Sequence, residues 1–253
     1  MLSWLFSHLL WLDHAFLLFV NSLAHRYWTL DTLIRLIVGN ELFKGGVVVA
    51  AIWWSWFRDG PHESRDTRYG NARDLLLYTL LICVPALLTA RTLGHILFRP
   101  RPVSNPALHL RIAFGFDVRT LETWSTFPSD HAALFFGLST GLFLVSRKIG
   151  WLMYAYSFFV ICLPRILLGI HYPSDVLAGA LLGIAAVNTV RFAPLRSLVL
   201  KPAQRLLAWS PSAFYAALFL LTWQTADLYD HLRHLEAKLE EVVRVWYHFL
   251  FLH

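Results

Sequence analysis

An all-α, polytopic membrane helical bundle with about six transmembrane helices is the fold class that this sequence predicts. Of its 253 residues, 57% are hydrophobic and only 15% are charged, whereas soluble domains carry about 25% charged residues. Apolar runs of roughly 20 residues, the length that crosses a bilayer as a helix, recur along the chain. The eleven Trp residues suit a protein with two membrane interfaces, where aromatic side chains collect.

Six apolar runs are the predicted spans. They cover about residues 2–24, 33–57, 74–98, 129–147, 150–170 and 172–193. The first is the weakest, because Asp13 and His14 lie in its middle, and an amphipathic helix along the membrane surface is the alternative. A seventh run, about 206–226, contains Pro211 and either spans or lies flat. These runs predict a membrane domain over 1–200 and a C-terminal extension over 201–253.

The C-terminal extension carries a heptad pattern between residues 228 and 250. Its apolar members are Leu228, Leu232, Leu235, Leu239, Val242, Trp246 and Phe249. Their spacing of three and four residues predicts an amphipathic helix. This helix either lies on the membrane or the bundle, or joins two copies of the chain as a coiled-coil homodimer.

Basic residues are divided unequally between the two sides of the predicted bundle. One set of loops holds Arg58, Arg65, Arg68, Arg73, Arg147, Lys148, Arg191, Arg196, Lys201 and Arg205. Cytoplasmic loops collect Lys and Arg, so we expect this set in the cytoplasm and the opposite ends of the helices outside. No basic tract interleaved with aromatic residues indicates a nucleic-acid partner.

Three polar stretches fall together on the predicted outer side. They are Arg99-Pro100-Arg101-Pro102 after the third segment, Phe127-Pro128-Ser129-Asp130-His131 at the start of the fourth, and Pro164-Arg165 with Gly169-Ile170-His171-Tyr172-Pro173-Ser174-Asp175 between the fifth and the sixth. Antiparallel packing of the helices can bring such ends together. Singly, each has an ordinary explanation, namely a membrane-edge anchor, a helix cap and a structural histidine. Their combination at one membrane depth predicts a site.

The residue types of this combination suit phosphoryl transfer. Arginine binds phosphate oxygens in pairs, and the N-terminus of a helix beginning at Ser129 adds an anion site. A histidine can attack phosphorus when a carboxylate holds its other ring nitrogen, and Asp175 lies one helical turn after His171. The second histidine, His131, can protonate the leaving oxygen. With no Asp/Glu cluster of the kind that binds Mg²⁺, we expect neither metal nor cofactor.

These stretches resemble the three-part signature of the type 2 phosphatidic acid phosphatase superfamily, Lys-x6-Arg-Pro, Pro-Ser-Gly-His and Ser-Arg-x5-His-x3-Asp. The resemblance covers about residues 91–190. It implies a membrane lipid phosphate phosphatase with His171 as nucleophile, Asp175 as its orienting carboxylate and His131 as general acid. It also implies a set of phosphate-binding residues, namely Arg101, Ser129 and Arg165.

The motif lysine is missing, because its position is occupied by Gly94. Arg91 and His95 are near enough in sequence to replace it. Lys44 is a third candidate, paired by spacing with Glu41 in the second segment. An ionisable pair within a membrane segment indicates a functional site by default, although a purely structural pair is equally compatible with the sequence.

Two further positions depart from the family signature. Asp130 replaces the motif glycine, and a carboxylate beside a phosphate is unfavourable unless it is paired or turned away. We include Asp130 among the substrate-binding candidates, since this form resembles the undecaprenyl pyrophosphate phosphatase branch. Pro164 replaces the serine before Arg165, which removes one hydroxyl.

A membrane amphiphile is the expected substrate, because a site at the outer interface is open to a lipid head group. Undecaprenyl pyrophosphate is the first choice, and phosphatidic acid, phosphatidylglycerol phosphate and a lipid A phosphate are the alternatives. The expected location is a bacterial inner membrane, with the site facing the periplasm or exterior. Two other classes remain: a catalytically inactive lipid-binding scaffold, and a transporter, although the repeated halves typical of transporters are not visible.

Overall fold

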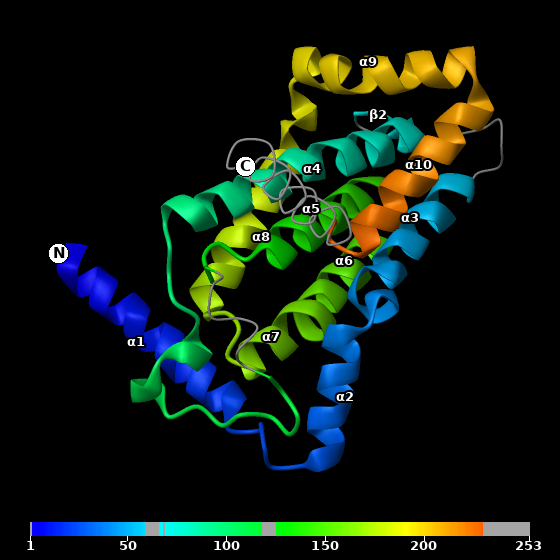
Figure 1. Cartoon of the computed structure of the whole chain (residues 1–253). Coiled ribbons are helices and arrows are strands. Elements are labelled where there is room, and N and C mark those ends of the chain that lie inside the picture. Colours follow the sequence, from blue (N-terminus) through cyan, green and yellow to red (C-terminus); the bar gives the residue numbers. More distant parts are fainter. Residues whose placement is uncertain (1, 59–65, 68, 118–124, 230–253) are drawn as a thin grey trace, which may run out of the picture.

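The structure, a computed structural model, describes residues 2–58, 66–67, 69–117 and 125–229, and for 2–9 and Asp66 the backbone alone. This part of the chain is mostly helical (Figure 1). The longer helices are α1 (Leu2–Asn21), α2 (Trp28–Gly39), α3 (Val47–Phe57), α4 (Ala72–Ile96), α5 (Asp130–Val145), α6 (Arg147–Tyr156), α8 (Pro173–Asn188), α9 (Ala193–Trp209) and α10 (Pro211–Ala226). Between them lie short helical turns, η1 (Leu42–Gly46), η2 (Pro102–Ser104), η3 (Pro106–Leu108), η5 (Ser157–Cys162), α7 (Leu163–Leu167) and η6 (Thr189–Arg191), and a two-stranded ribbon, β1 (Asp66–Thr67) with β2 (Gly70–Asn71).

The prediction of a helical membrane protein is confirmed, whereas the count of about six spans stays a prediction. Among the described residues, three continuous helices could cross a membrane by length and composition: Ala72–Ile96, Arg147–Leu167 and Pro173–Arg191. The second of these joins α6, η5 and α7. In the described part of the chain, α5 and the Leu10–Asn21 part of α1 are shorter apolar helices.

The segment predicted over 33–57 is not one straight helix. The helix begins earlier, at Trp28, and a bend of 71° separates Trp28–Gly39 from Leu42–Phe57. The bend falls at Asn40, whose backbone is extended and whose side chain accepts a hydrogen bond from the Leu42 N–H at 2.9 Å. Asn40 therefore ends one helix and caps the next. The two parts count as a fourth span only if the bent pair is taken as one.

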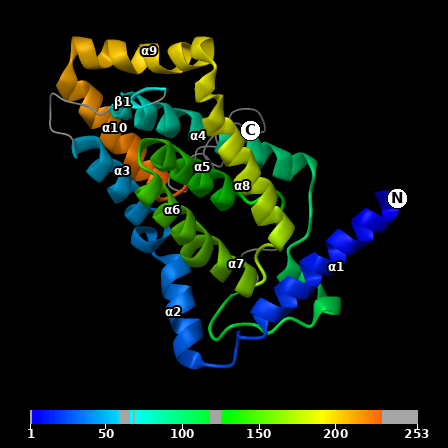
Figure 2. The ribbon, with the colours of Figure 1, turned by 180° about the vertical axis from the view of Figure 1, so that it is seen from behind.

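The C-terminal part of the described chain is arranged across and along the bundle. The apolar run predicted over 206–226 is divided at Ser210, which caps α10. α10 lies beside α3, and α9 crosses one end of the bundle (Figures 1 and 2). The heptad stripe predicted over 228–250 lies outside the described residues, except for residues 228 and 229.

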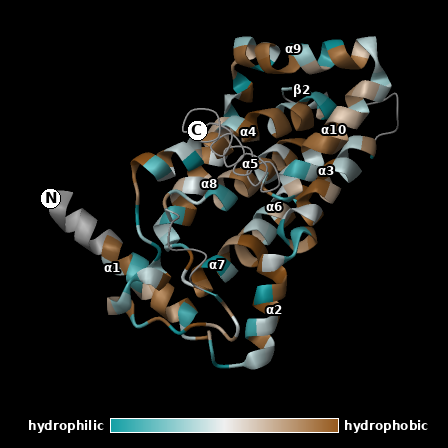
Figure 3. Cartoon of the chain, in the orientation of Figure 1, coloured by the Kyte–Doolittle hydropathy of each residue, from teal (hydrophilic) through white to brown (hydrophobic). Residues whose placement is uncertain are grey.

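The outer surface of the helices is apolar, as a lipid-facing surface must be. Hydrophobic residues predominate along α4, α8 and α10 (Figure 3). Large side chains such as Leu88, Leu177 and Phe219 are each more than half exposed. Because they lie on helices that also contribute to the buried core, the exposed apolar surface fits a membrane environment.

Close packing of α8 against α5 positions the site. Gly179 and Gly183 have the small-xxx-small spacing that lets helix backbones touch. A Cβ atom at Gly179 would overlap the main-chain carbonyl of Ser129, and one at Gly183 would overlap that of Ala133. The N-termini of α5 and α8 are therefore held side by side, with the C-terminal end of α4 on the same side of the bundle (Figure 1).

Candidate active site

His171 lies in the short connection between α7 and α8 and is almost fully buried. Its Nδ1 atom is 2.8 Å from the main-chain carbonyl oxygen of Thr126 and 3.1 Å from the hydroxyl of the same residue. A carbonyl oxygen can only accept a hydrogen bond, so Nδ1 carries the proton. The lone pair of the imidazole is thus on Nε2, which is the form that a nucleophilic histidine requires.

Asp175 contacts His171 indirectly, through Thr126. Its carboxylate accepts hydrogen bonds from the Thr126 hydroxyl at 2.6 Å, the Tyr172 N–H at 2.7 Å and the Arg99 guanidinium at 2.6 Å. Within the described structure no hydrogen bond joins Asp175 directly to His171. The predicted pairing of the two residues therefore takes an indirect form, in which Thr126 stands between carboxylate and imidazole.

His131, in contrast, has its own carboxylate. Both residues lie in the first turn of α5, where the Asp130 carboxylate is 2.8 Å from the Nδ1 atom of His131 and accepts its main-chain N–H at the same distance. Arg91 of α4 approaches the other oxygen of Asp130 to 3.6 Å. The carboxylate that replaces the motif glycine is thus paired with a cation and an imidazole, which offsets its unfavourable effect on a phosphate.

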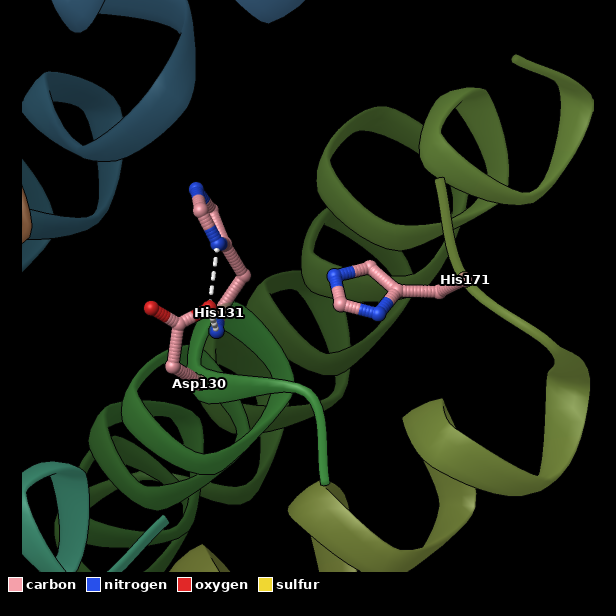
Figure 4. A group of neighbouring side chains, drawn as sticks. All are labelled: Asp130, His131 and His171. Carbon is pink, nitrogen blue, oxygen red and sulfur yellow. Dashed lines mark hydrogen bonds and ion pairs between the residues drawn. The ribbon is translucent and has the colours of Figure 1, made fainter. Parts of the chain in front are cut away.

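The two histidines converge, as the sequence predicted. One ligand-type atom from each of Asp130, His131 and His171 lies within 4.8 Å of the others. Figure 4 shows the ring of His171 pointing toward the start of α5, from which Asp130 and His131 project. A small group held between the two rings would reach both of them.

Arg101 and Arg165 bring positive charge to this place. Arg165 is buried on α7, where it donates to the Ile161 carbonyl at 2.7 Å, and its charge acts on both His131 and His171. Arg101 donates to the Ile170 carbonyl at 3.3 Å and acts on His171. Both predicted phosphate ligands therefore lie close to the predicted nucleophile.

Ser129 performs a structural task in the described structure. It is fully buried at the N-cap of α5, where its hydroxyl accepts a hydrogen bond from the Ala132 N–H. Its own N–H donates to the main-chain carbonyl of Asp175 at 3.0 Å. The helix-cap explanation is thus correct, and a contact of Ser129 with phosphate stays a prediction.

Burial, and next the positive charge of Arg101, lowers the pKa of His171 from the usual 6.5 to about 3. The imidazole is therefore neutral at pH 7, in agreement with its hydrogen bond to a carbonyl. Burial also lowers the pKa of Arg101, while the nearby Asp130 and Asp175 act in the opposite direction. The pKa values of His171 and Arg101 thus depend both on burial away from water and on the neighbouring charged groups.

The spacing of Asp130, His131 and His171 would also allow them to ligate a metal ion. However, Asp130 is already bonded to His131 and lies near Arg91, and the charges of Arg165 and Lys44 act on His131. These positive charges repel a cation and attract an anion. The electrostatic environment of these residues therefore fits a phosphate better than a metal ion.

At position 94, where the family motif has lysine, the backbone packs against the Ser125–Phe127 segment. A Cβ atom at Gly94 would lie 3.4 Å from the main-chain oxygen of Phe127, which is an ordinary van der Waals contact. Of the predicted replacements, Arg91 is engaged with Asp130 and the Leu228 carbonyl, and His95 is exposed.

Lys44 lies on the π-helical turn η1 with 11% of its side chain exposed, and its charge acts on His131. Its ion pair is with Asp227 at 3.6 Å, not with Glu41 as the spacing predicted. Lys44 and Arg91 thus both bring positive charge near Asp130 and His131, and which of them replaces the motif lysine stays a prediction.

Sequence reasoning missed three residues that organise the site: Thr126, Arg99 as a partner of Asp175, and Asp13. Thr126 carries no recognisable signal, since it lies two residues before Pro128, where the second motif begins. Asp13 did carry one, because a carboxylate within an apolar helix indicates a function by default. We interpreted it as a weakness of the first segment.

The fold and the site together define the class of this protein, a helical membrane phosphatase of phosphorylated lipids. Residues 74–196 match the family described as PAP2 superfamily, and this region of the chain belongs to that superfamily. The chain is 28% identical over 167 residues to the bacitracin transport permease protein BcrC of Bacillus licheniformis, covering 66% of this chain and 72% of that protein. It is 25% identical over 167 residues to the undecaprenyl-diphosphatase BcrC of Bacillus subtilis (strain 168), covering 65% and 75%. Among solved structures, Aquifex aeolicus LpxE aligns with a TM-score of 0.48 and 22% identity, over 70% of this chain and 93% of that chain.

Proposed function

We propose that this protein hydrolyses a lipid phosphate or diphosphate without a metal ion, through a phosphohistidine on His171. One observation carries the proposal: the Nδ1 atom of His171 is bonded to a carbonyl, which leaves Nε2 unprotonated beside a second imidazole. The positive charges of Arg101 and Arg165 act at the same place. A dianionic phosphate is the group that such an arrangement attracts.

The proposed reaction has two steps. In the first, Nε2 of His171 forms a bond to the terminal phosphorus, the bond from phosphorus to the leaving oxygen breaks, and His131 donates a proton to that oxygen. In the second, water attacks the phosphorus of the phosphohistidine while His131 takes a proton from that water. The bond from phosphorus to nitrogen breaks, and inorganic phosphate leaves.

The other residues of the site serve the phosphate and the two imidazoles. We assign Arg101, Arg165 and Ser129 to the equatorial phosphate oxygens, with Lys44 in the role of the missing motif lysine. Asp175 holds His171 through Thr126. Asp130, predicted as a substrate-binding residue, is better suited to holding His131, because its carboxylate bonds that ring directly.

Undecaprenyl pyrophosphate is the proposed substrate. The relative from Bacillus subtilis is an undecaprenyl-diphosphatase, and the apolar outer surface of the helices suits a substrate that stays in the membrane. In a diphosphate the leaving group is itself a phosphate, which departs more easily than an alcohol. Phosphatidic acid, phosphatidylglycerol phosphate and lipid A phosphate are the competing substrates in the experiment below.

We further propose that the protein resides in a bacterial inner membrane with six spans and with its site facing the periplasm or exterior. The distribution of basic residues supports this orientation. α9 carries three of the predicted cytoplasmic residues, Arg196, Lys201 and Arg205. It lies at the opposite end of the bundle from the site (Figure 1). A homodimer through residues 228–250 is part of the same proposal.

Phosphate release from a panel of lipids tests the proposal. The purified protein in detergent, with EDTA present, should release phosphate from undecaprenyl pyrophosphate faster than from the three competing lipids, and vanadate should inhibit it. His171→Ala should reduce the rate by about ten-thousandfold or more, whereas His109→Asn, a change at an exposed loop histidine, should leave it unchanged. With a substrate labelled at the terminal phosphate, quenching should trap the label on the wild-type protein.

The rival classes give different results in this experiment. A lipid-binding scaffold would bind the lipids without releasing phosphate. A transporter would move label across a liposome membrane without hydrolysis. Activity of His171→Ala near that of the wild type, or an absolute requirement for Mg²⁺, would contradict the proposed mechanism.

A further inference from the structure

The N-terminal helix reaches the site through Asp13. This carboxylate is 4% exposed and lies on α1, outside the region that matches the PAP2 superfamily. It accepts a hydrogen bond from the main-chain N–H of Ser174 at 2.7 Å and another from the hydroxyl of that residue. Arg99 donates to it at 3.0 Å. α1 is thereby attached to the first turn of α8, one residue before Asp175.

Arg99 joins this carboxylate to the one behind the nucleophile. One terminal nitrogen of its guanidinium faces Asp13, and the other is 2.6 Å from Asp175 and 2.9 Å from the Ser174 hydroxyl. The guanidinium lies 3.8 Å from the centre of the Tyr172 ring. A planar fork held against an aromatic face can bridge two carboxylates in a fixed geometry, which a lysine cannot do.

The bridge continues to His171. The second oxygen of Asp175 accepts the hydroxyl hydrogen of Thr126, whose carbonyl holds the Nδ1 atom of His171. The main-chain N–H of Thr126 donates to the carbonyl of Arg99 at 2.9 Å. Arg99 therefore contacts the supporting group of the nucleophile through both its side chain and its main chain.

We propose that Asp13 and Arg99 are positioning residues of the phosphatase, which orient His171 through Asp175 and Thr126. This inference rests on the proposed role of His171 as nucleophile. Asp13 fixes the rotation of the guanidinium, and the guanidinium fixes the Asp175 carboxylate. α1 is thus part of the catalytic structure.

A competing role for Arg99 is substrate binding. A cavity of about 460 Å³ is lined by Arg99, His14, Tyr172 and residues of the 100–106 segment. A ligand in this cavity would meet the exposed part of Arg99. The two roles differ in kinetics, because a substrate contact affects KM, whereas the orientation of the nucleophile affects kcat.

Steady-state kinetics with the preferred lipid of the panel, using the full-length protein in detergent, separate these roles. Asp13→Asn keeps the size of the side chain and loses the charge that holds Arg99, so kcat should fall about tenfold with KM within about twofold. Arg99→Lys keeps the charge but cannot bridge both carboxylates, and kcat should fall about a hundredfold, the effect of misplacing a reacting group by about 1 Å. The rate at which label appears on the protein in a single turnover should fall in parallel.

Asn21→Ala is the matched control, because it also loosens α1. The Asn21 amide donates to the Leu167 and Arg111 carbonyls at 2.8 and 3.0 Å, and its oxygen accepts the Arg111 N–H. None of these groups belongs to the bridge from Asp13 to His171. Asn21→Ala should lower the Tm and leave kcat within about twofold of the wild type.

Four results would overturn the inference. They are a rise in KM at unchanged kcat, an equal loss of kcat in Asp13→Asn and Asn21→Ala, wild-type kcat in Asp13→Asn, and wild-type kcat in Arg99→Lys. Inactivity of His171→Ala alongside any of them would leave the proposed function intact. If Asp13→Asn does not fold, the kcat and KM of Arg99→Lys decide between positioning and substrate binding.

Discussion

His171 and His131 are neighbours in space that are held by different partners. The Nδ1 atom of His171 bonds a main-chain carbonyl, with the Asp175 carboxylate one residue further away, and the ring is buried. The Nδ1 atom of His131 bonds the Asp130 carboxylate directly, and this side chain is 16% exposed.

The difference suits two different chemical roles. A carbonyl fixes the tautomer of a neutral imidazole without favouring a second proton, and such a ring is a nucleophile. A carboxylate in direct contact stabilises the positively charged ring, as a group that donates and recovers a proton requires. We therefore base the proposed roles of His171 and His131 on the group that the Nδ1 atom of each ring contacts.

Removal of the proton donor should have the largest effect. In His131→Ala, hydrolysis of a lipid monophosphate should slow by about a thousandfold, since general acid catalysis contributes about 10² to 10⁴. Loss on a diphosphate should be markedly smaller, because its leaving group needs less protonation. Phosphate release from matched monophosphate and diphosphate lipids measures both. Equal losses on the two substrates would contradict the assigned role of His131.

Thr126→Val should interrupt the support of His171 while leaving His131 untouched. Valine has nearly the same shape but lacks the hydroxyl that Asp175 accepts, so the carboxylate loses a partner inside the protein. We expect kcat to fall about a hundredfold, with Thr126→Ser close to the wild type. If Thr126→Val keeps full activity, the carbonyl alone orients the ring and the carboxylate is dispensable.

The low pKa of His171 predicts a pH dependence of stability. Between pH 6.5 and pH 3, the unfolded chain binds a proton at His171 that the folded protein does not bind. The free energy of unfolding therefore falls as the pH decreases through this window and gains nothing above it. From pH 7 to pH 5 the wild type should lose about 2 kcal/mol relative to His171→Gln, measured by denaturant unfolding in detergent. If the free energy of unfolding changes with pH in the same way in both proteins, His171 is not a buried neutral imidazole.

Asp130→Asn should have the smallest effect of this series, about a tenfold loss of kcat on a lipid monophosphate. Asparagine can still bond the ring of His131, but it does not stabilise the positive charge. The loss on a diphosphate should be slight. A loss as large as that of His131→Ala would indicate that Asp130 acts on the substrate itself.

The sequence predicted the helical class and the converging histidines because both follow from local patterns. Apolar runs specify helices in a membrane, and the motif residues lie at the ends of those runs. The bend at Asn40 was missed, although Asn40, Glu41 and Lys44 interrupt the apolar pattern and Gly39-Asn40 is a signal that ends helices.

The supporting partners could not be predicted in the same way. Thr126 acts through a main-chain carbonyl, which every residue has. Arg99 and Arg101 are alike in sequence, and only the packed structure directs the first to Asp13 and Asp175 and the second to the Ile170 carbonyl. Asp13 is separated from Arg99 by 86 positions. Such a pairing depends on how α1 lies against the bundle.

The two glycines of α8 have a consequence for how this site can change. Because Gly179 and Gly183 leave no space between the backbones of α5 and α8, the main chain sets the spacing between His171 and His131, the proposed nucleophile and proton donor. Altered surroundings can therefore retune which lipid is accepted without moving the reacting groups. In the proposed phosphatase we therefore expect recognition and reactivity to be separable, and a redesign for a different head group should begin in the 100–117 segment.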